Sequence, residues 1–85
     1  MHYFYMLRCS DNSLYSGQTN NLDKRIKEHN SNSQRGAKYL RAKKPVRLVY
    51  FEEFNTIQEA MVREYEVKQM TKLEKEELVA KPTKI

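Results

Sequence analysis

An arginine and a histidine on one predicted helix are the first side chains in this sequence that suggest chemistry. Within Leu14–His29, a short strand and a polar turn precede the helix, and Asn20 is positioned to cap it. One face of the helix carries four residues at i, i+3, i+4 and i+7 spacing: Leu22, Arg25, Ile26 and His29. The other face carries charges that we expect to be solvated: Asp23, Lys24, Lys27 and Glu28.

Arg25 and His29 thus lie among apolar residues, where a charge is costly unless it has a partner. Together with the preceding strand and its Tyr15, they predict a corner that binds an anion. Gly17, between strand and helix, permits a close backbone approach that a side chain would block. The alternative is an ordinary strand-to-helix joint, in which both side chains lie over the edge of the core.

A carboxylate on the predicted helix Ile57–Met70 is the second unusual feature. At about 100° per residue, the apolar residues of this helix form one arc, and Glu64 falls near its middle. The residues of the arc are Ile57, Ala60, Met61 and Val67. A carboxylate on a core-facing arc is costly without compensation. An ion pair with Lys68 is the simpler way to compensate the Glu64 charge. A metal ion, or the Arg25 and His29 pair, would instead compensate it as part of a functional site.

A cluster of cations between these two helices suggests a contact with phosphates. Its members are Arg35, Lys38, Arg41, Lys43, Lys44 and Arg47. Cations that gather without nearby acids suit phosphate binding, and the net charge of +5 agrees with an anionic partner, most often nucleic acid. The alternative is a solvated helix surface, although such surfaces usually alternate in sign.

These side chains must be positioned by a small set of strands and helices. The patterns predict strands at His2–Cys9, Leu14–Gln18 and Val46–Phe54, and helices from Leu22, at Gly36–Lys44, at Ile57–Met70 and from Thr71. Capping boxes that begin at Thr56 and Thr71 support the last two helices. The order predicts an α+β fold with a small, mostly antiparallel three-stranded sheet flanked by helices.

The register of the first hairpin decides whether two tyrosines share a face of the sheet. A two-residue turn would pair Arg8 with Tyr15, which would place Tyr5 on the opposite face from Tyr15. A three-residue loop would pair Cys9 with Tyr15 and place both tyrosines on one face. The sequence leaves the two registers open, and a shared site requires the odd-length loop or an equivalent bulge.

The size and composition of the chain limit its class. Residues 1–80 are expected to form a single domain and residues 81–85 a frayed tail. The single cysteine, Cys9, excludes an internal disulfide and a cysteine-rich metal site. The sequence has no apolar run of membrane-spanning length and no signal-peptide pattern, so we expect no membrane association and a cytoplasmic protein.

Taken together, these motifs resemble the GIY-YIG nuclease domain over nearly the whole chain, and the small stand-alone bacterial members in particular. The matching positions are Tyr3-Phe4-Tyr5, Tyr15-Ser16-Gly17, Asn21, Leu22, Arg25, His29 and the segment from Glu59 to Glu64. The chain departs from the pattern at two positions, since Tyr3 replaces a glycine and Ser16 replaces an isoleucine. In addition, Gln18 stands where some members have lysine.

The resemblance implies a metal-dependent endonuclease that hydrolyses phosphodiester bonds in DNA, with repair or recombination as expected settings. Glu64 would bind Mg²⁺ or Mn²⁺, which prefer oxygen ligands. Arg25 would donate to the phosphate. Tyr5, Tyr15 or His29 would act on the attacking water, and the residues themselves do not decide which.

Two other functions fit the same residues. The first is a non-catalytic module that binds DNA or RNA through the basic cluster. The second is a protein-interaction domain whose basic face meets an acidic partner. Because related nucleases usually take their specificity from an attached domain, the resemblance also implies either weak binding with little sequence preference or a protein partner that supplies the specificity.

Overall fold

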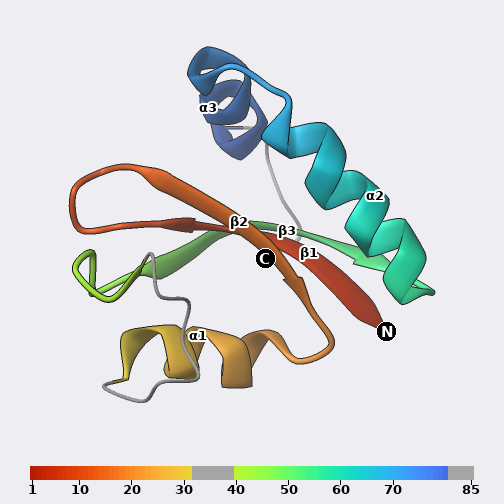
Figure 1. Ribbon diagram of the computed structural model, residues 1–85, viewed down its shortest axis with the longest axis horizontal. Helices are drawn as coiled ribbons and strands as arrows, with labels where there is room; N and C mark the ends of the chain where they lie inside the picture. The colour runs from red at the N-terminus through yellow and green to blue at the C-terminus, as the bar shows by residue number, and fades with distance from the viewer. Residues whose placement is uncertain (32–39, 81–85) are drawn as a thin grey trace.

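The computed structural model describes residues 1–31 and 40–80, and it contains a three-stranded antiparallel sheet with three helices (Figure 1). The strands are β1 at His2–Arg8, β2 at Leu14–Thr19 and β3 at Arg47–Phe54. The helices are α1 at Leu22–Asn30, α2 at Ile57–Lys68 and α3 at Lys72–Ala80. The predicted α+β class and the predicted order of strands and helices are confirmed, apart from the short helix expected at Gly36–Lys44.

The sheet has the order β2-β1-β3, so the first strand of the chain is the central one. Its pairing with β2 places Leu7 opposite Tyr15, which is neither of the two registers considered from the sequence. The loop is nevertheless of odd length, because Cys9 N donates to Ser13 O at 2.9 Å. Asn12 adopts φ 70° at the end of this loop, a conformation that asparagine tolerates. Tyr5 and Tyr15 therefore share a face of the sheet.

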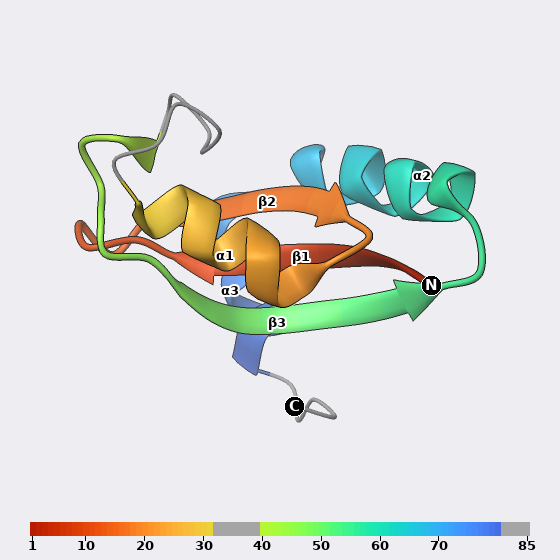
Figure 2. The same cartoon turned by 90° about the horizontal axis from the view of Figure 1, so that it is seen from below.

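Each face of the sheet is covered by different helices (Figures 1 and 2). On one face, α1 packs Leu22 and Ile26 against a core that contains Tyr5 and Leu7 of the central strand. On the other face, α2 and α3 pack against Phe4 and Met6 of the same strand. The alternation of large apolar residues along β1 predicted both covered faces, because successive side chains of a strand point to opposite sides.

The third strand does not keep the simple alternation that its sequence predicts. Its pairing with β1 shifts between Met6 and Leu7, so Val49 is an extra residue in the ladder. As a result, Val49 and Tyr50 both pack on the α2 face, whereas Leu48 packs on the α1 face.

The second helix begins where the capping box predicted and ends two residues early. Thr56 accepts from Glu59 N and Glu59 accepts from Thr56 N, so both halves of the box are present. The predicted apolar arc is half correct, because its members Ala60 and Val67 are buried whereas Ile57 and Met61 are exposed. None of the helices within residues 1–31 and 40–80 has the length and apolar character needed to cross a membrane.

Part of the predicted helix at Gly36–Lys44 is not helical. Over residues 41–44 the chain turns, with Lys43 N donating to Leu40 O at 3.0 Å, while residues 36–39 lie outside the described residues. Leu40 is buried in the α1-side core. The main chain of this turn is fixed to the first hairpin, since Ser10 N donates to Lys43 O at 3.0 Å.

Candidate functional site

Helix α1 holds Arg25 and His29 against the sheet. Its N-cap is Asn21, whose side chain accepts from Lys24 N at 3.1 Å, so the prediction of Asn20 as the cap is wrong by one residue. The helix itself begins at Leu22, as predicted, and Thr19 and Asn21 hydrogen-bond to each other just before it. Its inward face is the predicted one, and His29 is the only buried residue of the helix.

Tyr5 crosses the sheet surface over Gly17 of the neighbouring strand. The two residues are paired partners in the ladder. A Cβ atom on Gly17 would lie 2.7 Å from the Tyr5 hydroxyl oxygen, closer than side chains tolerate. The absence of a side chain at Gly17 therefore makes room for the phenol, which is the close approach that the sequence predicted.

A hydrogen bond joins the two most deeply placed polar groups of the site. The Tyr5 hydroxyl and His29 Nε2 lie 2.9 Å apart, and both residues are almost fully buried. Tyr15 completes the cluster from β2, with its ring edge-on to the imidazole at a centroid distance of 5.5 Å. Tyr15 itself is only half-buried, so it is the tyrosine of this cluster that reaches the surface.

Burial suppresses the ionisation of both hydrogen-bonded groups. It raises the pKa of Tyr5 to about 12, although the Arg25 guanidinium, which hydrogen-bonds the phenol, acts in the opposite direction. Burial also lowers the pKa of His29 to about 4, and the positive charge of Arg25 adds to this effect. At neutral pH, the site therefore contains a neutral phenol and a neutral imidazole beside a guanidinium.

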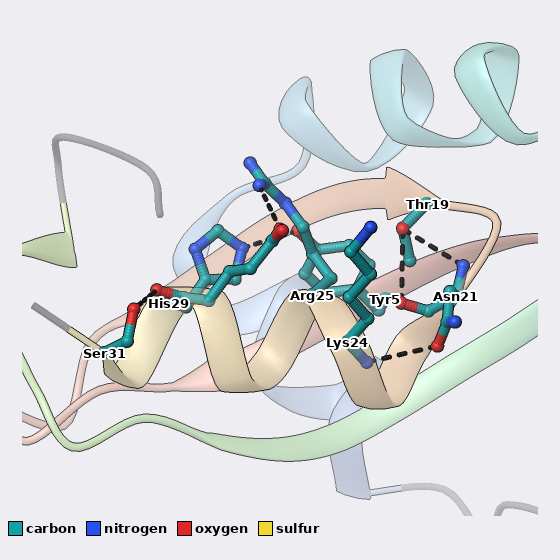
Figure 3. A network of polar contacts seen from close by, with 8 residues as sticks. Tyr5, Thr19, Asn21, Lys24, Arg25, His29 and Ser31 are labelled. Carbon is teal, nitrogen blue, oxygen red and sulfur yellow. Dashed lines mark hydrogen bonds and ion pairs between the residues drawn. The ribbon is translucent and has the colours of Figure 1, made fainter. Parts of the chain in front are cut away.

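Arg25 is held between the phenol and a carboxylate on its own helix (Figure 3). Burial alone would lower the pKa of Arg25, but hydrogen bonds to Glu28 and Tyr5 raise it above its ordinary value. The Arg25 Nη1 to Glu28 Oε1 distance is 3.0 Å. Glu28 is therefore not the fully solvated charge that the sequence predicted. The i, i+3 spacing of the two residues was the signal that could have found this pair.

Glu64 lies across the sheet from these residues. It lies on α2, whereas Arg25 and His29 lie on α1, and these helices cover opposite faces (Figure 2). Its negative charge contributes to the raised pKa of Tyr5. The Glu64 side chain is 21% exposed, and Oε2 lies 2.7 Å from Lys68 Nζ, which is the simpler of the two compensations considered from the sequence.

The structure thus joins four of the predicted site residues in one network, in which His29 contacts Tyr5 and Tyr15, and Tyr5 hydrogen-bonds Arg25. Glu64 is connected to them only through its electrostatic effect on Tyr5. Within residues 1–31 and 40–80, no three or more histidines, cysteines or acids are grouped as metal ligands. Glu64 is a single carboxylate with oxygen donors and partial exposure. It fits a Mg²⁺ or Mn²⁺ ion that keeps most of its water ligands, and it does not fit an all-protein metal site.

The predicted basic cluster is only partly described, and its described members differ in their surroundings. Arg35 and Lys38 lie outside the described residues. Lys43 pairs with Asp11 at 3.0 Å, so an acid that is distant in sequence lies beside a cluster expected to have none. Lys44 Nζ donates to Ser31 O at 3.0 Å. Arg41 and Arg47 are exposed.

Gln18, at the position where some proteins with this motif have lysine, lies away from the cluster. It pairs with Phe4 in the ladder, so its side chain lies on the α2 face of the sheet, where it hydrogen-bonds His2. A lysine side chain at this position would point to that same face of the sheet.

Comparisons with known proteins agree with this fold. Residues 1–77 match the family model described as the GIY-YIG catalytic domain. UPF0213 protein CPE1444 of Clostridium perfringens is 52% identical over 80 residues, which cover 94% of this chain and 84% of that protein. UPF0213 protein YazA of Bacillus subtilis is 48% identical over 75 residues, covering 88% of this chain and 74% of that protein.

A solved structure has a similar fold. The solution NMR structure of UPF0213 protein BH0048 from Bacillus halodurans matches with a TM-score of 0.60 and 48% identity. The match covers 93% of this chain and 82% of that chain. The sheet and the helices around it are therefore shared with these relatives.

Proposed function

Since this chain belongs to the GIY-YIG catalytic domain family, we propose that it is a metal-dependent endonuclease that hydrolyses phosphodiester bonds in DNA. The observation that carries the proposal is the cluster of Arg25 with Tyr5, Tyr15 and His29. A guanidinium held beside two phenols in a partly buried site is suited to bind the phosphate of a phosphodiester and to stabilise the charge that develops on it.

Arg25 is assigned to the phosphate. Its side chain is 30% exposed, so the guanidinium can meet a substrate while Glu28 and Tyr5 fix its orientation. A guanidinium has donors in a planar fork, which match two oxygens of one phosphate. As negative charge develops on the phosphate during attack by water, these donors stabilise it.

Tyr15 is the group we assign to the attacking water. The other two candidates are poorly placed for this role, because Tyr5 is 1% and His29 is 2% exposed. The raised pKa of Tyr5, about 12, keeps its proton in place at neutral pH. His29 Nε2 is already engaged with the Tyr5 hydroxyl. We therefore assign Tyr5 and His29 to the positioning of Arg25 and Tyr15.

Glu64 is assigned to the metal. Its carboxylate would hold Mg²⁺ or Mn²⁺, with water and phosphate oxygens as the remaining ligands. When bound, the ion supplies Lewis-acid stabilisation of charge on the phosphate and the leaving oxygen. The Lys68 ammonium now occupies one oxygen of this carboxylate, so the ion competes with that pair.

The test is cleavage of supercoiled plasmid and of branched DNA by purified protein with Mg²⁺ or Mn²⁺. We expect nicking by the wild type, and its loss in Glu64→Gln and in Arg25→Lys, which keeps the charge but loses the fork. Glu66→Gln is the matched control, because Glu66 lies exposed on the same helix. Tyr15→Phe should lose cleavage, while Tyr3→Phe should keep it. Cleavage that survives Glu64→Gln or Arg25→Lys removes that residue from the proposal.

A second candidate function is binding of nucleic acid without cleavage. It is favoured by one observation, the engagement of the Glu64 carboxylate with Lys68 at 2.7 Å. Salt-dependent binding of DNA or RNA, with no nicking under any metal condition tested, supports this function over the nuclease.

A further inference from the structure

A groove lies between α2 and the end of β3, on the face of the sheet that α2 covers. Its volume is about 540 Å³. Glu52 and Phe54 form its β3 wall, since they stand at alternate positions of the strand and therefore share this face. The other wall belongs to α2 and includes Glu59, Val62, Arg63 and Glu66. We call this feature the acidic groove.

Carboxylates outnumber cations in the acidic groove. Glu52, Glu59 and Glu66 all line it, whereas Arg63 is the one cation among the described residues that do so. Arg63 Nε lies 3.1 Å from Glu52 Oε1, and Arg63 Nη1 lies 3.3 Å from Glu66 Oε1. One guanidinium thus stands against three carboxylates, so the groove is net negative in a chain whose net charge is +5. Such a groove repels phosphates and attracts cations.

The acidic groove also has apolar surface between its acids. Val62 on α2 is 59% exposed, and Phe54 across the groove is half-buried. An exposed apolar centre with a charged rim is typical of surfaces that bind proteins. The carboxylates disfavour a nucleic-acid strand, because they repel its phosphates. The occupant that fits both features is a protein segment with cationic and apolar side chains.

The backbone of β3 provides a way to bind such a segment. β3 is an edge strand, on the opposite side of the sheet from β2 (Figure 2). Within residues 1–31 and 40–80 it pairs with β1 alone, so its outer edge presents backbone N–H and C=O groups. After the extra residue Val49, its ladder with β1 is regular from Tyr50 to Phe54. A strand added there places every second side chain on the α2 face, in the acidic groove.

We propose that the acidic groove and the outer edge of β3 bind an extended, basic segment of a partner protein. The segment pairs with β3 as a fourth strand, and its cationic side chains meet the carboxylates of the groove. A second copy of this chain fits less well, because Glu52 and Glu53 are neighbours on this edge, and two copies paired through it place acids near acids. The binding requires neither metal nor cleavage, so it can be tested apart from the proposed nuclease function.

The test is an NMR titration of the isotope-labelled full chain, in EDTA, with a capped peptide in which threonine alternates with arginine and valine. When extended, this probe presents arginine and valine on one face. We expect shifts in the amide signals of Glu52, Val62 and Glu66, and slower hydrogen exchange of the β3 amides that point away from β1. The control is the same peptide with glutamate in place of arginine, which should leave these signals unchanged.

Two substitutions separate binding in the groove from general damage to the fold. Val62→Lys adds a cation to the apolar centre and should weaken binding of the arginine peptide about tenfold. Met61→Lys is the matched control, because Met61 is 52% exposed on the same helix and does not line the groove. Glu66→Lys should weaken binding of the arginine peptide and create binding of the glutamate peptide, a reversal that loss of helix structure does not produce.

Several outcomes overturn the proposal. The arginine peptide leaves the groove signals unchanged, both peptides bind equally, or Val62→Lys binds as the wild type does. If the same signals shift with rising concentration of the chain alone, a second copy occupies the groove and the proposal is wrong. If an oligonucleotide shifts them, the occupant is nucleic acid and the proposal is equally wrong. The nuclease function is decided separately, by the cleavage assay with Glu64→Gln and Arg25→Lys.

Discussion

At the scale of single residues, the hydrogen bond between Tyr5 and His29 is the centre of the candidate site. Both groups are nearly dry, and each loses the ionised form that water would stabilise. A neutral pair of this kind fixes geometry and leaves the positive charge to Arg25. In the proposed site, Tyr5 and His29 therefore fix the geometry and Arg25 carries the charge. The residue types alone had left the roles of Tyr5 and His29 interchangeable.

The lowered pKa of His29 predicts a pH-dependent stability. The unfolded chain protonates His29 near its ordinary pKa of 6.5, whereas the folded chain does so near 4. Between these values the unfolded state binds more protons, so the free energy of unfolding falls as the pH is lowered. We expect a loss on the order of 1 kcal/mol between about pH 7 and about pH 5.5 by urea denaturation.

His29→Gln is the control for this prediction, since it cannot titrate and can still hydrogen-bond the phenol. Its unfolding free energy should change much less over the same window. The acids with lowered pKa, Asp11 and Glu76, lose their contributions at lower pH, from the ordinary carboxyl pKa downward, which lies below this window. An equal slope in wild type and variant would show that another group causes the dependence.

The contact between Gly17 and Tyr5 gives a second prediction at this scale. Gly17→Ala places a methyl group against the buried phenol and should reduce the free energy of unfolding by about 1–3 kcal/mol. Tyr5→Phe removes the nearest atom, so it should cost less in the Gly17→Ala background than in the wild type. Additive losses in this double-mutant cycle, measured by urea denaturation, contradict the proposed clash.

At the scale of elements, long-range polar contacts fix helix α3 and the first hairpin in place. Arg8 at the end of β1 donates from both terminal nitrogens to Glu76 of α3, each at 2.7 Å. Arg8 is also paired in the ladder with Arg47 of β3. Two cations directly opposite repel each other, so Glu76 compensates a charge conflict as well as joining α3 to the sheet.

Glu76→Gln should therefore destabilise the protein more than an ordinary surface exchange does. We expect a loss on the order of 1 kcal/mol, because the pair is bidentate and partly shielded from water. Glu77→Gln, at the exposed neighbouring position, should be close to neutral. Thermal unfolding at low and high salt measures both, and a Glu76→Gln loss no larger than that of Glu77→Gln rejects this role for the pair.

At the scale of the whole molecule, two helical layers on one sheet place the assigned residues on both of its faces. The central strand supplies the core of both layers, with Tyr5 and Leu7 on one side and Phe4 and Met6 on the other. The edge strand β2 carries Gly17, so Tyr5 reaches this edge of the sheet. The net charge of +5 adds a general attraction for anions.

The exposed cations Arg41 and Arg47 predict the salt dependence of nucleic-acid binding. If each neutralises one phosphate, then Arg41→Gln and Arg47→Gln should each reduce the slope of log affinity against log salt by about 0.7 for a single strand. Lys24→Gln is the control, because Lys24 is exposed on α1, on the face away from the sheet. Filter binding over a salt series measures the slopes, and unchanged slopes in both arginine variants place the contact elsewhere.

The sequence by itself determined what depends on neighbours along the chain. The capping box at Thr56, the inward face of α1 and the two apolar faces of β1 follow from spacings of one to four residues, and the structure has all three. The motif spacing likewise identified the family, because Tyr5, Tyr15, Arg25 and Glu64 stand in its order.

Only the tertiary structure decided the relations between distant segments. The register that pairs Leu7 with Tyr15 and the bulge at Val49 arise from packing against two helical layers, which no local pattern encodes. The same is true of the exposure of Met61 and of the pairing of Lys43 with Asp11. Burial and long-range charge depend on which elements meet in space. For that reason, helical periodicity predicted the face of Glu64 but not its place across the sheet from Arg25.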